Sequence, residues 1–153
     1  MIAFDEDDKL DFGHLPPAVD RLLHQGVAAH FADPALAERH FLAALALAPD
    51  TLPAHRCLVK HYNRCRQFDK TLPAARGWVA AARQAGLPAD WLLWQKAPGS
   101  ALAALKGLAF IELRLGRPER AEAAIRRVLA LDPEDGVGGS VIAALIDETL
   151  LMA

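Results

Sequence analysis

Residues 105–133 read LKGLAFIELRLGRPERAEAAIRRVLALDP, and this stretch decides the fold class. Apolar residues recur every three or four positions on both sides of Gly116-Arg117-Pro118, which is the spacing of helices that bury one face. A glycine after one periodic run and a proline at the start of the next are typical boundary signals of helices. The stretch therefore predicts two helices joined by a short turn.

The composition of the whole chain also favours helices. Its 153 residues include 31 alanines but only 15 valines, isoleucines and threonines together. Alanine favours helices, whereas β-branched residues favour strands. The pair itself covers about residues 101–115 and 119–131. Periodicity and boundary signals predict further helices over about residues 17–31, 34–47, 52–66, 68–85 and 141–151, with a short turn over 91–96. We therefore expect an all-α protein.

The helix pair of residues 105–133 recurs earlier in the chain. Residues 22–49 carry the same pattern of small and apolar positions, and a weaker copy begins near residue 55. Equivalent positions of the second helices, Ala37 and Thr71, are 34 residues apart, whereas Thr71 and Ala121 are 50 apart. The excess of 16 residues predicts an insertion near residues 87–100. An ordinary helical bundle with coincidental spacing is the alternative.

This pattern resembles the tetratricopeptide repeat. The matching positions in the last copy are Leu105, Leu108, Ala109, Glu112, Ala121, Ile125 and Pro133. Those in the first copy are Leu22, Gln25, Gly26, Ala29, Ala37, Phe41 and Pro49. The resemblance implies a helical-hairpin solenoid over residues 15–153, with about three helix pairs and a C-terminal capping helix.

The resemblance also implies a concave surface, lined by the first helix of each repeat, that holds an extended peptide. The repeat register places mainly cations there in the second and third copies and apolar residues in the first. The predicted groove consists of Arg56, Lys60, Asn63, Arg64, Lys106, Phe110, Leu113, Arg114, Leu23, Val27, His30 and Phe31. Cations attract an acidic partner, so we expect a non-catalytic adaptor or assembly factor. A solvated helix face carrying Arg56, Lys60 and Arg64 is the alternative.

A second hypothesis rests on Cys57, His61 and Cys65, which are spaced four residues apart. Residues at this spacing share one face of a helix, and thiolate with imidazole suits zinc or iron. The chain would then be a metal-handling or metallocofactor-assembly protein, with further ligands from His24 or His55. The repeat register instead favours buried, reduced thiols beside a hydrogen-bonded His61, and hence no metal or other cofactor.

The sequence offers few residues for catalysis. Ser100 and Ser140 are the only serines, and both lie where helix N-caps are expected. The glycine-rich residues 136–139 follow a helix and lack the Lys-Ser/Thr pair of a phosphate-binding loop. We expect a linker there and no enzymatic activity.

Charge is distributed unevenly along the chain, whose net charge is −2. Residues 1–12 carry −4, residues 13–131 carry +7 and residues 132–153 carry −5. The central region is less basic than nucleic-acid-binding domains usually are. No apolar run approaches the roughly 20 residues that cross a bilayer, and the acidic N-terminus is unlike a signal peptide. We expect a cytoplasmic protein that binds neither nucleic acid nor a membrane.

The two ends of the chain carry separate predictions. Residues 1–14 form an acidic arm, which could place Phe4 or Phe12 in the groove and so act as an autoinhibitory stand-in for the partner. A solubilising tail is the alternative. The last helix carries Val141 and Leu145 on one of its faces, which predicts either a homodimer contact or a frayed terminus.

Overall fold

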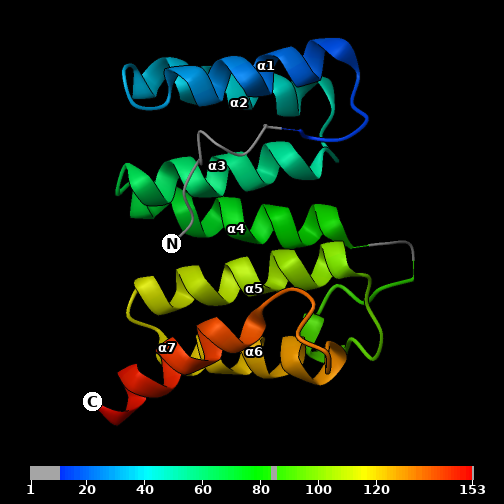
Figure 1. Ribbon diagram of the computed structural model, residues 1–153, viewed down its shortest axis with the longest axis vertical. Coiled ribbons are helices and arrows are strands. Elements are labelled where there is room, and N and C mark those ends of the chain that lie inside the picture. The colour runs from blue at the N-terminus through cyan, green and yellow to red at the C-terminus, as the bar shows by residue number, and fades with distance from the viewer. Residues whose placement is uncertain (1–10, 84–85, 153) are drawn as a thin grey trace. The chain divides into compact units, whose positions relative to one another are not determined.

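The computed structural model describes residues 11–83 and 86–152 (Figure 1). Within these residues the chain forms seven α-helices, one short 3-10 helix and no strand. The α-helices are α1 (Pro17–Ala29), α2 (Pro34–Leu47), α3 (Leu52–Arg64), α4 (Phe68–Ala82), α5 (Gly99–Arg114), α6 (Pro118–Leu131) and α7 (Gly139–Leu151). The 3-10 helix η1 (Trp91–Leu93) lies between α4 and α5 in the sequence. The predicted all-α class is confirmed.

The helices begin where proline and capping signals predict. Pro17, Pro34 and Pro118 all stand in the first turn of their helices, where the N–H that proline lacks has no intrahelical partner. The Asp33 carboxylate caps α2 by accepting a hydrogen bond from the backbone N–H of Leu36 at 3.1 Å. Local chemistry therefore sets these boundaries.

The two serines are not N-caps, and that prediction was wrong. Ser100 and Ser140 lie inside the first turns of α5 and α7, and the N-cap of α7 is Gly138 in the left-handed conformation. The Asp135 carboxylate supports this helix start by accepting hydrogen bonds from the backbone N–H and the hydroxyl of Ser140. These bonds hold the pKa of Asp135 below its usual value.

The chain divides into two compact units, which we call the N-terminal unit (up to Ala74) and the C-terminal unit (from Ala75). The boundary falls within α4, so that this helix contributes to both. In the N-terminal unit, α2 packs against α1 and α3. The core of this unit consists of Val19, Leu23, Ala37, Phe41, Ala44, Ala54, Cys57, Leu58 and Tyr62.

Close contact between α1 and α2 depends on small residues. A Cβ atom at Gly26 would overlap the ring of Phe41, and Ala37 is fully buried. Phe41 itself is fully buried. Small residues on facing helices thus make room for one large aromatic side chain, as the spacing of the repeat predicts.

The C-terminal unit packs α6 against α5, η1 and α7. The predicted insertion is part of this packing, because Trp94 is fully buried and its Nε1 donates a hydrogen bond to the Pro88 carbonyl at 2.8 Å. A Cβ atom at Gly107 would lie 2.5 Å from the ring of Trp78, so α5 and the second half of α4 also meet closely. Adjacent helices thus pack in pairs within both units, as in helical repeats.

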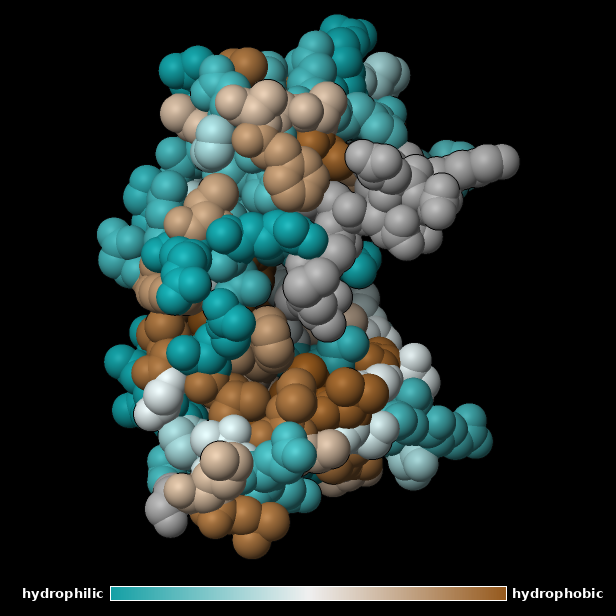
Figure 2. All heavy atoms as spheres, turned by 60° about the vertical axis from the view of Figure 1, so that its left-hand side comes forward, coloured by the Kyte–Doolittle hydropathy of each residue, from teal (hydrophilic) through white to brown (hydrophobic). Residues whose placement is uncertain are grey.

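Apolar side chains remain on the surface of the C-terminal unit, and Figure 2 shows hydrophobic residues gathered in the lower part of its view. Val141, Leu145 and Leu151 of α7 and the following Met152 are exposed. The homodimer contact expected at this end remains a prediction. None of the helices in the described part of the chain has the length and apolar character needed to cross a bilayer.

The predicted N-terminal arm lies mostly outside the described residues, which begin at Asp11. The position expected for Phe4 and for the acidic residues before Asp11 therefore stays a prediction. Phe12 is described, and its ring makes an edge-to-face contact with His24 at 4.9 Å between centroids. Phe12 also packs against the core of the N-terminal unit.

Candidate functional site

Three of the predicted groove cations lie along one face of α3. Arg56, Lys60 and Arg64 are spaced four residues apart, so their side chains follow one another along the helix. Arg56 is exposed, while Lys60 and Arg64 are half-buried. The opposite face of α3 enters the core through Cys57 and Leu58. The helix is thus amphipathic, with its cationic face outside the core.

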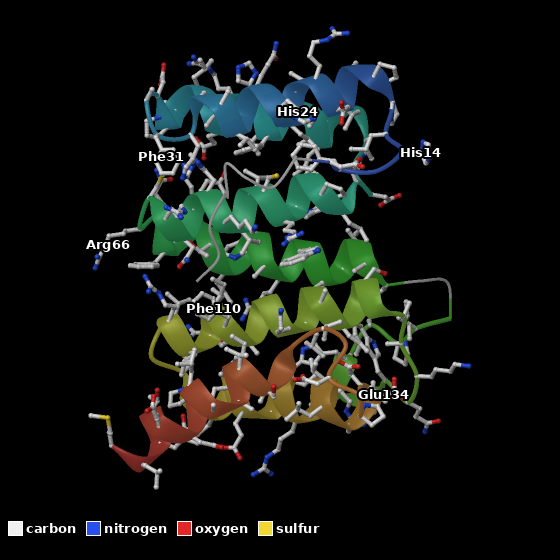
Figure 3. All side chains as sticks on the ribbon, in the orientation of Figure 1. His14, His24, Phe31, Arg66, Phe110 and Glu134 are labelled. Atoms are coloured by element: carbon white, nitrogen blue, oxygen red, sulfur yellow. The ribbon has the colours of Figure 1, made fainter. Side chains whose placement is uncertain are left out.

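The C-terminal end of α3 combines this charge with an aromatic and an amide side chain. The Arg64 guanidinium lies 5.4 Å from the ring centroid of Phe31, which is 68 % exposed. Asn63 is buried, and its Oδ1 has no hydrogen-bond partner among the described residues. Figure 3 shows Phe31 at the α1–α2 turn on the same side of the unit as Arg66, which follows α3. This end of the N-terminal unit therefore offers cationic and aromatic groups, whereas the predicted groove residue Asn63 lies beneath the surface.

The structure separates the predicted groove residues of α1 by their burial. Val27 is half-buried and Phe31 is exposed, so both can contribute to a surface. Leu23 is fully buried in the core and His30 is 3 % exposed. Leu23 and His30 thus lie beneath the surface that the repeat register assigns to them, because α1 packs closely on α2 and α3.

The remaining groove candidates belong to α5 of the C-terminal unit. Phe110 and Leu113 are half-buried there, and Arg114 is exposed. The Lys106 ammonium donates a hydrogen bond to the backbone carbonyl of Val137 at 2.7 Å. Lys106 therefore secures the loop before α7, a structural role that the sequence analysis missed. Arg56, Lys60 and Arg64 are the predicted groove cations that lie together on one helix, α3.

Two buried histidines meet in the N-terminal unit. The Nδ1 atoms of His30 and His61 lie 2.7 Å apart, so one ring donates a hydrogen bond and the other accepts it. Burial lowers the pKa of His30 to about 4, and the charges of His61 and Arg64 act in the same direction. Burial also lowers the pKa of His61, against the effects of the Glu38 carboxylate and the Pro34 carbonyl. Both rings are therefore neutral at pH 7.

Cys65 completes a cluster with these histidines. Its Sγ lies 4.0 Å from Nδ1 and 3.9 Å from Nε2 of His61. One ligand atom from each of His30, His61 and Cys65 lies within 4.8 Å of the other two. Cys57 points into the apolar core, where burial raises its pKa to about 12. The structure therefore brings His61 and Cys65 together as the helical spacing predicts, with His30 beside them in place of Cys57.

The histidines expected to add further ligands lie elsewhere. His24 approaches the Asp20 carboxylate at 3.5 Å, and Nε2 of His55 lies 2.8 Å from the Pro49 carbonyl. No signal within one helix identifies His30, because it comes from α1 and its contact with α3 is tertiary. Both cysteines are free thiols in the structure; Cys57 is buried, as the repeat register predicts, whereas Cys65 is half-buried.

A polar network surrounds the same part of α3. The Tyr62 hydroxyl donates a hydrogen bond to Glu38, and the Lys70 ammonium donates another at 3.0 Å. These two bonds hold the pKa of Glu38 below its usual value. Burial raises the pKa of Tyr62, and so does its bond to Glu38. Glu38 thus links α2 to α3 and to the first half of α4.

The C-terminal unit has a separate cavity of about 580 Å³. Apolar side chains such as Trp91 and Leu92 line it together with Arg76, Arg83 and Glu112. The buried Glu112 carboxylate lies 4.0 Å from Arg76 and 3.7 Å from Arg117, so its charge is compensated inside the unit. Arg120 also lines the cavity, so three arginines stand there against one glutamate, and the cavity is a second cationic region among the described residues.

No family model matches the chain, and no curated protein or solved structure is significantly similar to it. Functional inference therefore depends on the side chains described above.

Proposed function

We propose that the protein is a non-catalytic adaptor or assembly factor whose N-terminal unit binds an acidic peptide segment. The observation that carries this proposal is the row formed by Arg56, Lys60 and Arg64 on the outer face of α3. Neither Arg56 nor Arg64 forms an ion pair with a described residue. Carboxylates of a partner can therefore bind them without displacing an internal acid.

Apolar groups beside the row favour a peptide over a small anion. Phe31 offers an exposed ring and Val27 an apolar surface on α1. The Asn63 side chain is buried beneath these groups, so it does not contribute to the exposed surface. A segment that alternates acidic and apolar side chains would match both the cationic and the apolar groups.

Helix packing supports a solenoid of the tetratricopeptide-repeat kind as the scaffold. The pairs α1–α2 and α5–α6 both pack side by side, and Ala37 and Ala121 are fully buried at equivalent places. Gly26 lets the Phe41 ring approach α1. Solenoids of stacked helix pairs commonly present extended binding surfaces to partner proteins.

Charge reversal tests the proposal. The full chain is used to capture partners from a lysate of its native host, which are then identified by mass spectrometry. Arg56→Glu with Arg64→Glu should abolish capture, and capture by the unaltered chain should weaken steeply with salt. Arg21→Glu with Arg39→Glu is the matched control, because both residues are exposed in the same unit and form no ion pair with described residues. Equal capture by the two double variants would contradict the proposal.

A further inference from the structure

The histidine and cysteine cluster joins the ends of two helices. His30 is the C-cap of α1, Cys65 is the C-cap of α3, and His61 belongs to the last turn of α3. Phe31 and Arg66, which follow His30 and Cys65 in the sequence, lie on the same side of the unit in Figure 3. Two imidazoles and one thiol therefore converge through tertiary packing rather than through helical spacing alone.

We propose that His30, His61 and Cys65 form a binding site for a divalent transition metal, with Zn²⁺ as the best match. Imidazole nitrogen and thiolate sulfur are the ligands that zinc prefers, whereas Mg²⁺ and Ca²⁺ prefer oxygen ligands. All three candidate ligands are nitrogen or sulfur, and none is a carboxylate. The site goes beyond the proposed peptide binding, since it uses buried groups behind the cationic face of α3.

The candidate ligand atoms all lie within 4.8 Å of one another, a wider spread than in a tetrahedral zinc site. Zn–N bonds of about 2.0 Å and Zn–S bonds of about 2.3 Å place two nitrogens about 3.3 Å apart and nitrogen and sulfur about 3.6 Å apart. The observed separations are 2.7 Å between the two Nδ1 atoms and 4.0 Å between Nδ1 of His61 and Sγ of Cys65. Small side-chain rotations, which separate the rings and bring the thiol closer, would open the space for the ion.

The surroundings suit a metal with one open coordination position. His61 is fully buried, whereas Cys65 is half-buried and adjoins the surface. An ion can therefore enter from the side of Cys65, and a water molecule or a partner's side chain can supply the fourth ligand. The Glu38 carboxylate acts electrostatically on both His61 and Cys65, and it would offset part of the positive charge of the ion.

Binding requires the thiolate form of Cys65, so a proton must leave. Neutral His30, neutral His61 and the Cys65 thiol combine with Zn²⁺. The ring that carries its proton on Nδ1 changes tautomer and carries it on Nε2, so that two Zn–N bonds and one Zn–S bond form, and the S–H proton passes to the buffer. The charge of the site changes from zero to +1. No oxidant or reductant takes part.

Metal titration of the full chain tests the site. Metal-free protein is titrated with Zn²⁺ alone by calorimetry in two buffers, and with Co²⁺ alone by absorption spectroscopy. We expect one ion per chain, release of one proton, and a thiolate-to-Co²⁺ charge-transfer band. Substitution of residues that only support metal ligands costs about 10–100-fold in affinity, so Cys65→Ser and His30→Gln should each cost at least a hundredfold.

Two matched variants make the test specific. Cys57→Ala removes the other thiol of α3, and His55→Gln removes an imidazole of the same helix, and both lie outside the cluster. Each should leave the zinc affinity within about threefold, and circular dichroism should show that every variant is folded. Absence of stoichiometric binding, or equal losses in Cys57→Ala and Cys65→Ser, would overturn the proposal.

Discussion

The two units of the chain bury different kinds of side chain. Among its residues from Asp11 onward, the N-terminal unit buries five polar residues, which are His30, Thr51, His61, Asn63 and Thr71. In the described part of the C-terminal unit, Glu112 is the one buried polar or charged residue. Buried polar groups cost free energy unless they are hydrogen-bonded, and the C-terminal unit shows that paired helices pack well with few of them. Helix packing alone therefore does not explain why the N-terminal unit buries more polar side chains.

The largest expected effects on the free energy of unfolding come from removing a large buried aromatic side chain, which both units contain. Phe41 and Trp94 are both fully buried. Phe41→Ala and Trp94→Ala should each lower the free energy of unfolding by about 3–5 kcal/mol, because each leaves a large cavity. Denaturant titration followed by circular dichroism measures the change. Leu47→Ala, at an exposed position, is the control and should change the free energy by less than about 0.5 kcal/mol.

The second prediction is that removing a buried polar side chain costs more stability in the N-terminal unit than in the C-terminal unit. His61→Leu removes the hydrogen bond between His61 and the buried Nδ1 of His30, and it should cost about 1–3 kcal/mol of stability. Glu112→Leu should be nearly neutral, because Arg76 and Arg117 are half-exposed and stay hydrated without their acidic partner. The same denaturant titration compares them. A larger loss for Glu112→Leu would reverse the comparison between the units.

Local signals made most of the fold predictable. Prolines and the Asp33 cap lie at helix starts, and their effect depends only on neighbouring residues. The serine caps were predicted wrongly, because Asp135 reaches the start of α7 from the preceding loop. The position of a helix end is thus more predictable than the side chain that caps it.

The candidate site was predictable only in part. The spacing of His61 and Cys65 places them on one face of a helix, and their contact follows from it. The contact of His30 with His61 joins residues 31 positions apart. It depends on how α1 packs on α3, which no periodicity within one helix can specify. The same spacing could not tell which of Cys57 and Cys65 enters the apolar core.

The smallest expected effect concerns the pH dependence of the N-terminal unit. The pKa of Glu38 is lowered in the folded state, so the unfolded chain binds a proton more readily. Glu38 therefore stabilises the unit above its unfolded pKa, and this contribution is lost as the pH falls through the lower folded pKa. Glu38→Gln should cost at most about 1 kcal/mol at pH 7, because Lys70 is largely exposed. Unfolding titrations of both proteins between pH 7 and low pH should converge, and a difference that grew on acidification would contradict this role.

Amide hydrogen exchange tests most directly the claim that the N-terminal unit carries the binding function. Exchange is measured by mass spectrometry for the full chain alone and for the chain bound to its captured acidic partner. The account predicts slower exchange in α3 and in the α1–α2 turn around Phe31, with α5, α6 and α7 unchanged. Slower exchange confined to the C-terminal unit would contradict it.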